Sequence, residues 1–134
     1  MSFLPGIGKF MKYICPLIVV EDVNRSRFLY EKILKQKVKA DYGENVVFEG
    51  DFAIHQKAHF QSLINHYPIK RYSHNFELYF EEENLEEIEK ILKENDFEFI
   101  HQIKEQPWKQ KVLRFYDYDK NIIEIGEPIK LIAK

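Results

Sequence analysis

A chain of 134 residues that is 45% hydrophobic and 31% charged is long enough to bury one hydrophobic core. Its 20 basic and 22 acidic residues give a formal charge of −2, so no excess of positive charge is available to neutralise a nucleic-acid backbone. Five glycines and five prolines are too few for a collagen-like or low-complexity chain. We therefore expect a folded domain that does not bind nucleic acid.

The first ten residues are not expected to form a targeting or membrane segment. Their apolar run is interrupted by Pro5 and Gly6, and it is shorter than a signal-peptide core or a membrane span. Met11 can serve as an alternative start, so we interpret residues 1–10 as an N-terminal extension or a cloning remnant. The single cysteine, Cys15, cannot form an internal disulfide and indicates a reducing compartment. We expect a cytoplasmic protein without a membrane partner.

The first half of the chain predicts one strand, one helix and three further strands. A β-branched run at 14–20 indicates the first strand. Asp22 or Asn24 can then cap a helix that contains the pentapeptide EKILK at 31–35. The strand-like runs that follow cover residues 37–41, 45–49 and 52–55.

The second half repeats this order. The pentapeptide EKILK recurs at 89–93, and an internal repeat of this kind indicates two copies of one structural unit. A strand is expected at 76–80, followed by a helix that Asn84 caps and that carries apolar residues at helical spacing. Three more strand-like runs cover residues 97–102, 111–117 and 121–126.

Each half therefore has the order βαβββ. The two halves, about 11–58 and 74–128, are joined by a segment at 59–73 that we expect to be irregular. Strands grouped in this way favour an α+β domain over alternating βαβ units with a parallel sheet. The predicted fold is one domain over residues 11–128, built from two tandem βαβββ modules.

The closing segment carries the most specific motif of the chain. Residues 106–127 are QPWKQKVLRFYDYDKNIIEIGE. They resemble the end of the glyoxalase / bleomycin-resistance / extradiol-dioxygenase family, also called the vicinal oxygen chelate superfamily, where the pattern Q-P-W-G-x-x-V-x-R-F-x-D-P-D-G-x-x-I-E ends the second module. The opening half is similar to the same family. This resemblance covers residues 11–127 and implies two modules that form curled, half-open sheets around a cavity.

The sequence departs from the family pattern mainly at turns. Lysine or aspartate stands where the family usually has glycine, at Lys35, Asp51, Lys109 and Lys120, and Tyr118 stands where it has proline. Glycine is used where φ is positive, so we expect remodelled turns or a strain of about 1 kcal/mol at such positions. The loops near the site are the parts that these changes affect most.

The resemblance implies a divalent metal ion held by side chains from four strands. Two of these ligand positions, which we call metal seats, lie seven residues before the caps Asp22 and Asn84, and one lies on the last strand of each half. The predicted metal seats are Cys15, His55, Glu77 and Glu124. A thiolate, an imidazole and two carboxylates form a ligand set that zinc, nickel or manganese accepts. The dioxygenase and fosfomycin-type triads are absent, because both need histidine at the first-strand seats.

Each seat also has an interpretation without a metal. Cys15, next to Pro16, is typical of a small buried apolar residue. His55 is equally consistent with a histidine bonded to a neighbour, and Glu77 faces either solvent or the cavity. Glu124 poses the same choice, although the motif around it favours a function. A carboxylate that faces the cavity without a metal or another cation carries a raised pKa.

The first hypothesis is a metal-dependent lyase or isomerase resembling lactoylglutathione lyase. The metal would polarise a substrate that chelates it through two adjacent oxygens, while Glu124, with Glu77 as its partner, moves a proton between neighbouring carbons. Arg114 and Trp108 are candidates to orient an anionic or planar substrate. Alternatively, Arg114 pairs with Asp117 or with Glu124, and Trp108 covers the edge of the sheet.

The second hypothesis is a metal-free protein that sequesters a small molecule in the same cavity, as bleomycin-resistance proteins do. The unusual residues Cys15 and Glu77 favour this hypothesis, whereas His55 and Glu124 favour the first. Under both hypotheses the resemblance implies a small-molecule substrate or ligand. It also implies a homodimer, because the family usually pairs its modules across chains.

Overall fold

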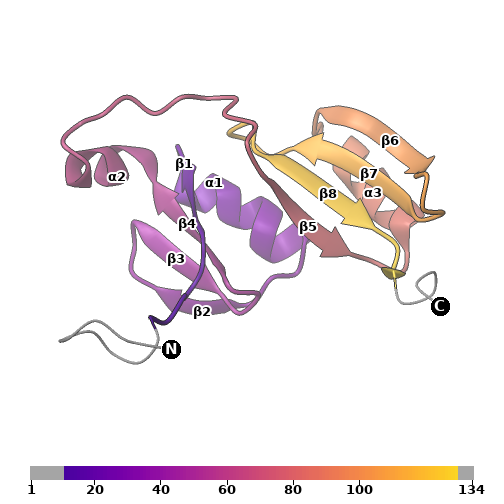
Figure 1. Ribbon diagram of the computed structural model, residues 1–134, viewed down its shortest axis with the longest axis horizontal. Helices are drawn as coiled ribbons and strands as arrows, with labels where there is room; N and C mark the ends of the chain where they lie inside the picture. Colours follow the sequence, from indigo (N-terminus) through magenta and orange to yellow (C-terminus); the bar gives the residue numbers. More distant parts are fainter. Residues whose placement is uncertain (1–10, 130–134) are drawn as a thin grey trace, which may run out of the picture.

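The computed structural model describes residues 11–129, so the predicted N-terminal extension at 1–10 lies outside the described part of the chain. Within that part, each half of the sequence forms its own four-stranded sheet, and the two sheets lie side by side (Figure 1). No helix in residues 11–129 is long and apolar enough to cross a membrane. The predicted α+β class is confirmed.

The first half forms a sheet with the strand order β1-β4-β3-β2. Its elements are β1 (Leu17–Val20), α1 (Val23–Arg27), the π-helical turn η1 (Phe28–Ile33), β2 (Val38–Asp41), β3 (Asn45–Phe48) and β4 (Phe52–Gln56). Strands β1 and β4 are parallel, whereas the other neighbours are antiparallel. Asp22 is the helix cap, because its Oδ1 accepts a hydrogen bond from the Arg25 amide at 3.1 Å.

The second half repeats the same topology, with the strand order β5-β8-β7-β6. Its elements are β5 (Glu77–Glu81), α3 (Leu85–Glu94), β6 (Phe99–Glu105), β7 (Lys111–Tyr116) and β8 (Ile122–Gly126). The parallel pair is β5 and β8, as β1 and β4 are in the first half. Asn84 caps α3 as predicted, because its Oδ1 accepts from the Glu87 amide at 3.2 Å. Two copies of one βαβββ module are therefore present.

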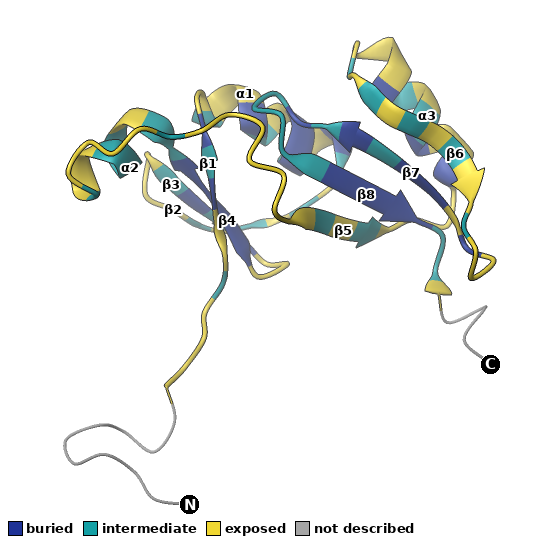
Figure 2. Ribbon diagram, turned by 45° about the horizontal axis from the view of Figure 1, so that its top comes forward, coloured by how far each residue is buried: buried dark blue, intermediate teal, exposed yellow. Residues whose placement is uncertain are grey.

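The segment between the halves begins with a helix that the sequence did not indicate. Helix α2 (Lys57–Leu63) follows β4 directly, and the Gln56 side chain caps it by accepting from the His59 amide at 2.8 Å. No residue of α2 is buried, so its sequence has no apolar periodicity. Figure 2 shows α2 with a mixture of intermediate and exposed residues, and the chain after it largely exposed. The expectation of an irregular segment at 59–73 is therefore wrong for its first part.

One hydrophobic core runs through both halves. Alternate residues of each sheet point into it, such as Ile18 of β1 and Ile123 of β8, and α3 adds Leu92. The two halves meet inside this core, where the ring centroids of Phe52 and Phe80 lie 6.0 Å apart. The other face of each sheet, which we call its open face, carries the residues that lie between these core positions.

The turns retain the backbone that the family pattern predicts. The φ angles are 58° at Lys35, 63° at Asp51, 77° at Lys109 and 68° at Lys120, all in the left-handed region that favours glycine. These are the positions where the sequence carries a longer side chain in place of glycine. The turns therefore keep the left-handed backbone conformation, although this conformation disfavours the lysine and aspartate residues that occupy it.

Candidate functional site

Arg114 joins two of the predicted metal seats on the open face of the second sheet. Its Nε donates to Glu77 Oε1 and its Nη2 donates to Glu124 Oε1, both at 3.0 Å. Its Nη1 lies 3.0 Å from Nε2 of His101 on the neighbouring strand β6. These four residues are called the Arg114 cluster. Of the two predicted pairings of Arg114, the one with Glu124 is present.

The charges of the Arg114 cluster are coupled. Burial raises the pKa of the Glu124 carboxyl, and the adjacent Glu77 raises it further, while Arg114 opposes both effects. Burial lowers the pKa of Arg114, but its hydrogen bonds and charge interactions with Glu77 and Glu124 outweigh this and raise it. The guanidinium is therefore charged, and it supplies the cation that a cavity-facing carboxylate requires.

Trp108 is held beside the same open face by a short chain of hydrogen bonds. Its Nε1 donates to Gln110 Oε1 at 2.7 Å, and Gln110 Nε2 donates to the Tyr79 hydroxyl at 2.8 Å and to the Glu127 carbonyl at 2.7 Å. The Tyr79 hydroxyl in turn donates to Glu81 Oε2 at 2.6 Å. The indole is thereby fixed at the end of the sheet, although about half of Trp108 remains exposed.

His55 lies on the first sheet and is engaged by a neighbouring histidine. It is buried on β4, and its Nε2 lies 2.8 Å from Nδ1 of His59 on α2. Burial lowers the pKa of His55, and the nearby His59 lowers it further. This hydrogen bond could not be predicted from the sequence, because it depends on a helix that the sequence did not indicate.

The strand register separates Cys15 from the seat to which it was matched. His55 and Glu124 occupy equivalent positions, since each lies opposite the third residue of its parallel neighbour strand. The first residues of those neighbour strands are Leu17 and Glu77, which are therefore equivalent to each other. Cys15 is a free, partly exposed cysteine two residues before β1. Cys15 was placed by counting seven residues back from the helix cap, as for Glu77. This count does not give equivalent residues, because the connection from the strand to the helix cap is shorter in the first half than in the second.

The donor set of a single chain does not fit a divalent metal ion. Within residues 11–129, no three histidine, cysteine, aspartate or glutamate side chains gather as a group that could hold one. Glu77 and Glu124 are brought together, but the cation between them is the guanidinium of Arg114. His55 is paired with His59 in the other half of the chain.

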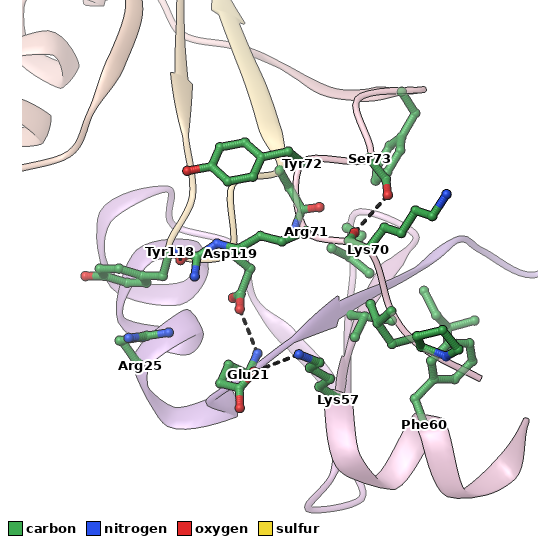
Figure 3. Close-up of a pocket in the computed structure, with 17 residues that line it drawn as sticks. Glu21, Arg25, Lys57, Phe60, Lys70, Arg71, Tyr72, Ser73, Tyr118 and Asp119 are labelled. Atoms are coloured by element: carbon green, nitrogen blue, oxygen red, sulfur yellow. Dashed lines mark hydrogen bonds and ion pairs between the residues drawn. The ribbon is translucent and has the colours of Figure 1, made fainter. Parts of the chain in front are cut away.

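A groove of about 650 Å³ lies between the two halves (Figure 3). Its walls come from β1, the start of α1, α2, the linker at 68–73 and the turn between β7 and β8. None of the four predicted metal seats lines it, and neither does Arg114 or Trp108. Its volume is in the range of 300–1,000 Å³ that is usual for small-molecule sites.

Sequence reasoning missed the residues of this groove. Many of them lie in the linker that was expected to be irregular, and in a turn that was considered only for its backbone, while the others come from β1, α1 and α2. The available signal was the run PIKRY at 68–72, where two adjacent basic residues stand beside an aromatic one. This run lacks a known motif, so the sequence alone gave no reason to choose it.

Residues 13–130 match the model of the family described as "Glyoxalase-like domain". This match covers most of the chain, so the chain belongs to the glyoxalase-like family. The sequence resemblance to the glyoxalase, bleomycin-resistance and dioxygenase superfamily is thereby confirmed. A search of curated proteins found no match to the chain.

Solved structures show the same fold. A protein of unknown function from Agrobacterium tumefaciens is 33% identical, with a TM-score of 0.79 over 90% of this chain and 97% of its own. A glyoxalase/bleomycin resistance protein/dioxygenase family enzyme from Burkholderia phytofirmans is 12% identical, with a TM-score of 0.71 over 85% and 97%. A glyoxalase-related enzyme from Fulvimarina pelagi is also 12% identical, with a TM-score of 0.73 over 88% and 89%. At 12% identity the similarity concerns the fold alone.

Proposed function

We propose that this member of the glyoxalase-like family binds a small molecule in the groove between its two halves, and that it does so without a metal ion. The observation that carries the proposal is the groove itself, whose walls come from both halves and from the linker. Its lining mixes apolar side chains with a few charged ones, as ligand sites usually do. The proposal corresponds to sequestration rather than to chemical conversion of the ligand.

The hydrogen bonds of the Glu77 and Glu124 carboxylates support the proposal that no metal ion is bound. A metal ion would have to displace Arg114, which donates one hydrogen bond to Glu77 and one to Glu124. Charge-assisted hydrogen bonds of this type are stronger than neutral ones, and breaking them would leave a guanidinium without its partners. The chain itself therefore already supplies one positive charge between these two carboxylates.

A second candidate is the metal-dependent lyase or isomerase that resembles lactoylglutathione lyase. It is favoured by one observation, the close approach of Glu77 to Glu124 together with the raised pKa of Glu124, since perturbed carboxylates suit proton transfer. In this candidate Glu124 holds and returns the proton, and a second copy of the chain contributes the His55 seat. The homodimer and the cytoplasmic location remain predictions from the resemblance and from the single cysteine.

Metal analysis distinguishes the two candidates. The protein is purified without a metal-chelating column, supplied with zinc, nickel or manganese, freed of loose metal and analysed by mass spectrometry. We expect fewer than about one ion per two chains, with no change in the variant Glu124→Gln. The control is Glu83→Gln, which removes an exposed carboxylate that is not part of the Arg114 cluster. A stoichiometric ion that is lost in Glu124→Gln and retained in Glu83→Gln would contradict the metal-free proposal.

A further inference from the structure

The groove carries an excess of positive charge on a chain whose formal charge is −2. Four basic and two acidic side chains line it. They are Arg25, Lys57, Lys70, Arg71, Glu21 and Asp119. A concave surface lined mainly by one sign of charge focuses the field and attracts ligands of the opposite sign. The lining therefore favours an anion.

One oxygen of each of the two carboxylates is engaged by another group of the chain. Glu21 Oε2 lies 3.6 Å from Lys57 Nζ, and Asp119 Oδ1 accepts a hydrogen bond from the Glu21 amide at 2.8 Å. Asp119 Oδ2 is buried and has no hydrogen-bond partner in the described part of the chain. Within residues 11–129, neither Arg25 nor Arg71 forms a salt bridge with a carboxylate. Both guanidiniums therefore retain donors for a ligand.

These two arginines converge on Tyr118. The Arg25 Cζ lies 5.0 Å from the centroid of the Tyr118 ring, and Arg71 Nη2 donates to the Tyr118 carbonyl at 3.4 Å. Figure 3 shows their side chains approaching Tyr118 from the α1 side and from the linker side. A guanidinium presents several N–H donors in a planar fork that matches the two oxygens of a carboxylate. This end of the groove is therefore suited to hold one.

Apolar side chains form another part of the lining. Leu17 of β1 is 51% exposed and Phe76 is 47% exposed, and both face the groove together with Phe60 of α2. Large apolar side chains that remain this exposed gain stability when a flat apolar group covers them. A ligand that satisfies both parts of the groove is charged at one end and planar and apolar at the other.

We propose that the groove selects aromatic carboxylates, with the carboxylate bound by Arg25 and Arg71 and the ring lying against Leu17 and Phe76. This inference rests on the proposed small-molecule function of the groove and adds the chemical class of its ligand. It assigns the ligand to a site that is separate from the Arg114 cluster.

Three probes that share a naphthalene ring and carry a negative, a neutral and a positive group test this inference. They are 1-naphthoate, 1-naphthalenemethanol and 1-naphthylmethylammonium, each titrated into the nitrogen-15-labelled protein at neutral pH and followed by NMR. We expect 1-naphthoate to shift the amide signals of residues 69–73 and 118–121. It should bind at least about tenfold more tightly than the neutral alcohol, because hydrogen bonds to charged groups contribute this much. The ammonium probe should bind more weakly than the alcohol.

Arginine variants test which side chains cause the preference for 1-naphthoate over the alcohol. The double variant Arg25→Gln/Arg71→Gln should lose the preference for 1-naphthoate over the alcohol. The control Lys39→Gln/Lys104→Gln removes two positive charges from exposed positions on β2 and β6, and it should keep that preference. The single variant Arg71→Gln changes an exposed residue of the linker, so it provides a milder test if the double variant does not fold. Retention of the full preference in Arg71→Gln and in the double variant would overturn the inference.

The outcomes also separate this inference from the proposed function. Equal binding of naphthoate and the alcohol in the groove would overturn the charge selection but leave the metal-free binding function standing. Naphthoate shifts confined to the Arg114 cluster would overturn both the ligand assignment and the choice of the groove as the site. A failure of naphthoate to bind at millimolar concentration would overturn the inference.

Discussion

Tyr30 ties the two halves of the chain together through one buried hydrogen bond. Its hydroxyl, on η1 in the first half, donates to Asp117 Oδ2 in the second half at 2.6 Å. Asp117 Oδ1 also accepts from the backbone amides of Asp119 at 2.9 Å and Asn121 at 2.8 Å. Tyr30 therefore supports the β7–β8 turn, which forms one wall of the groove.

We predict that Tyr30→Phe lowers the free energy of unfolding by about 1.5–3 kcal/mol at pH 7, because it removes a buried hydrogen bond to a charged group. Burial and the charge of Asp117 raise the pKa of Tyr30 well above its usual value. The folded state thus keeps a proton that the unfolded state releases above about pH 10. This contribution is fully present below that pH and is lost as the pH rises towards the folded-state pKa.

Urea unfolding at pH 7 and at about pH 10.5 checks both parts of this prediction. The stability of the wild type should fall between the two pH values by more than that of Tyr30→Phe. The control Tyr13→Phe changes a tyrosine that is 78% exposed, and it should behave like the wild type. An equal loss of stability at high pH in the wild type and in Tyr30→Phe would show that Tyr30 is not the group responsible.

At the level of single residues, the sequence predicted part of the Arg114 cluster. Glu124 and Arg114 are directly opposite each other on antiparallel strands, so alternation along two adjacent strands was enough to suggest their pairing. The repeat indicated Glu77 as a metal seat and as the partner of Glu124, but not as a partner of Arg114. The contact with His101 was not expected, because the pairing of β6 with β7 contains register shifts that no local pattern indicates.

The turns of the fold maintain a backbone that their residues disfavour. Lys109 has a φ of 77°, and Lys109 is an exposed residue in the loop between β6 and β7. A residue with a Cβ loses about 1 kcal/mol in this conformation relative to glycine. The chain therefore carries strain that a single substitution can remove.

We predict that Lys109→Gly raises the free energy of unfolding by about 0.5–1 kcal/mol, as the relief of left-handed strain exceeds the entropy that glycine adds to the unfolded chain. The matched opposite change is Gly43→Ala. Gly43 has a φ of 84° and open space around its missing Cβ, so only the backbone opposes the alanine. Urea unfolding should show opposite signs for the two variants. Destabilisation by Lys109→Gly would mean that its side chain contributes more than its backbone costs.

Not every element could be predicted from its sequence. The same pentapeptide lies in the α-helix α3 in the second half, but in the first half it lies at the end of a π-helical turn, where the Leu34 amide donates to the Leu29 carbonyl at 2.9 Å. Periods of 3.6 and 4.4 residues cannot be distinguished over so short a segment. The pentapeptide by itself therefore does not decide the helix type.

The groove is a property of the whole molecule. The hydrogen bond from the Glu21 amide to Asp119, for example, joins residues that are 98 positions apart in the sequence. The fold could be predicted from local patterns and from the repeat. The groove could not, because no sequence motif spans such a distance. The predicted metal seats come from the family pattern, whose ligand positions lie on the strands of the two sheets and not in the linker.

The distribution of charge in the whole molecule agrees with metal-free binding. Basic side chains are in excess around the groove, while the paired carboxylates of the second sheet are bound by Arg114. Under the proposed function, the chain's own arginines attract an anion to the groove, and no metal ion is needed to bind it.

Calorimetric titration of 1-naphthoate into the same protein, first treated with EDTA and then supplied with zinc, tests this account most directly. Ionic strength is held constant because salt screens the arginine charges. We predict one binding site per chain with the same Kd in both conditions. Loss of binding after EDTA treatment and its return with zinc would contradict metal-free binding in the groove.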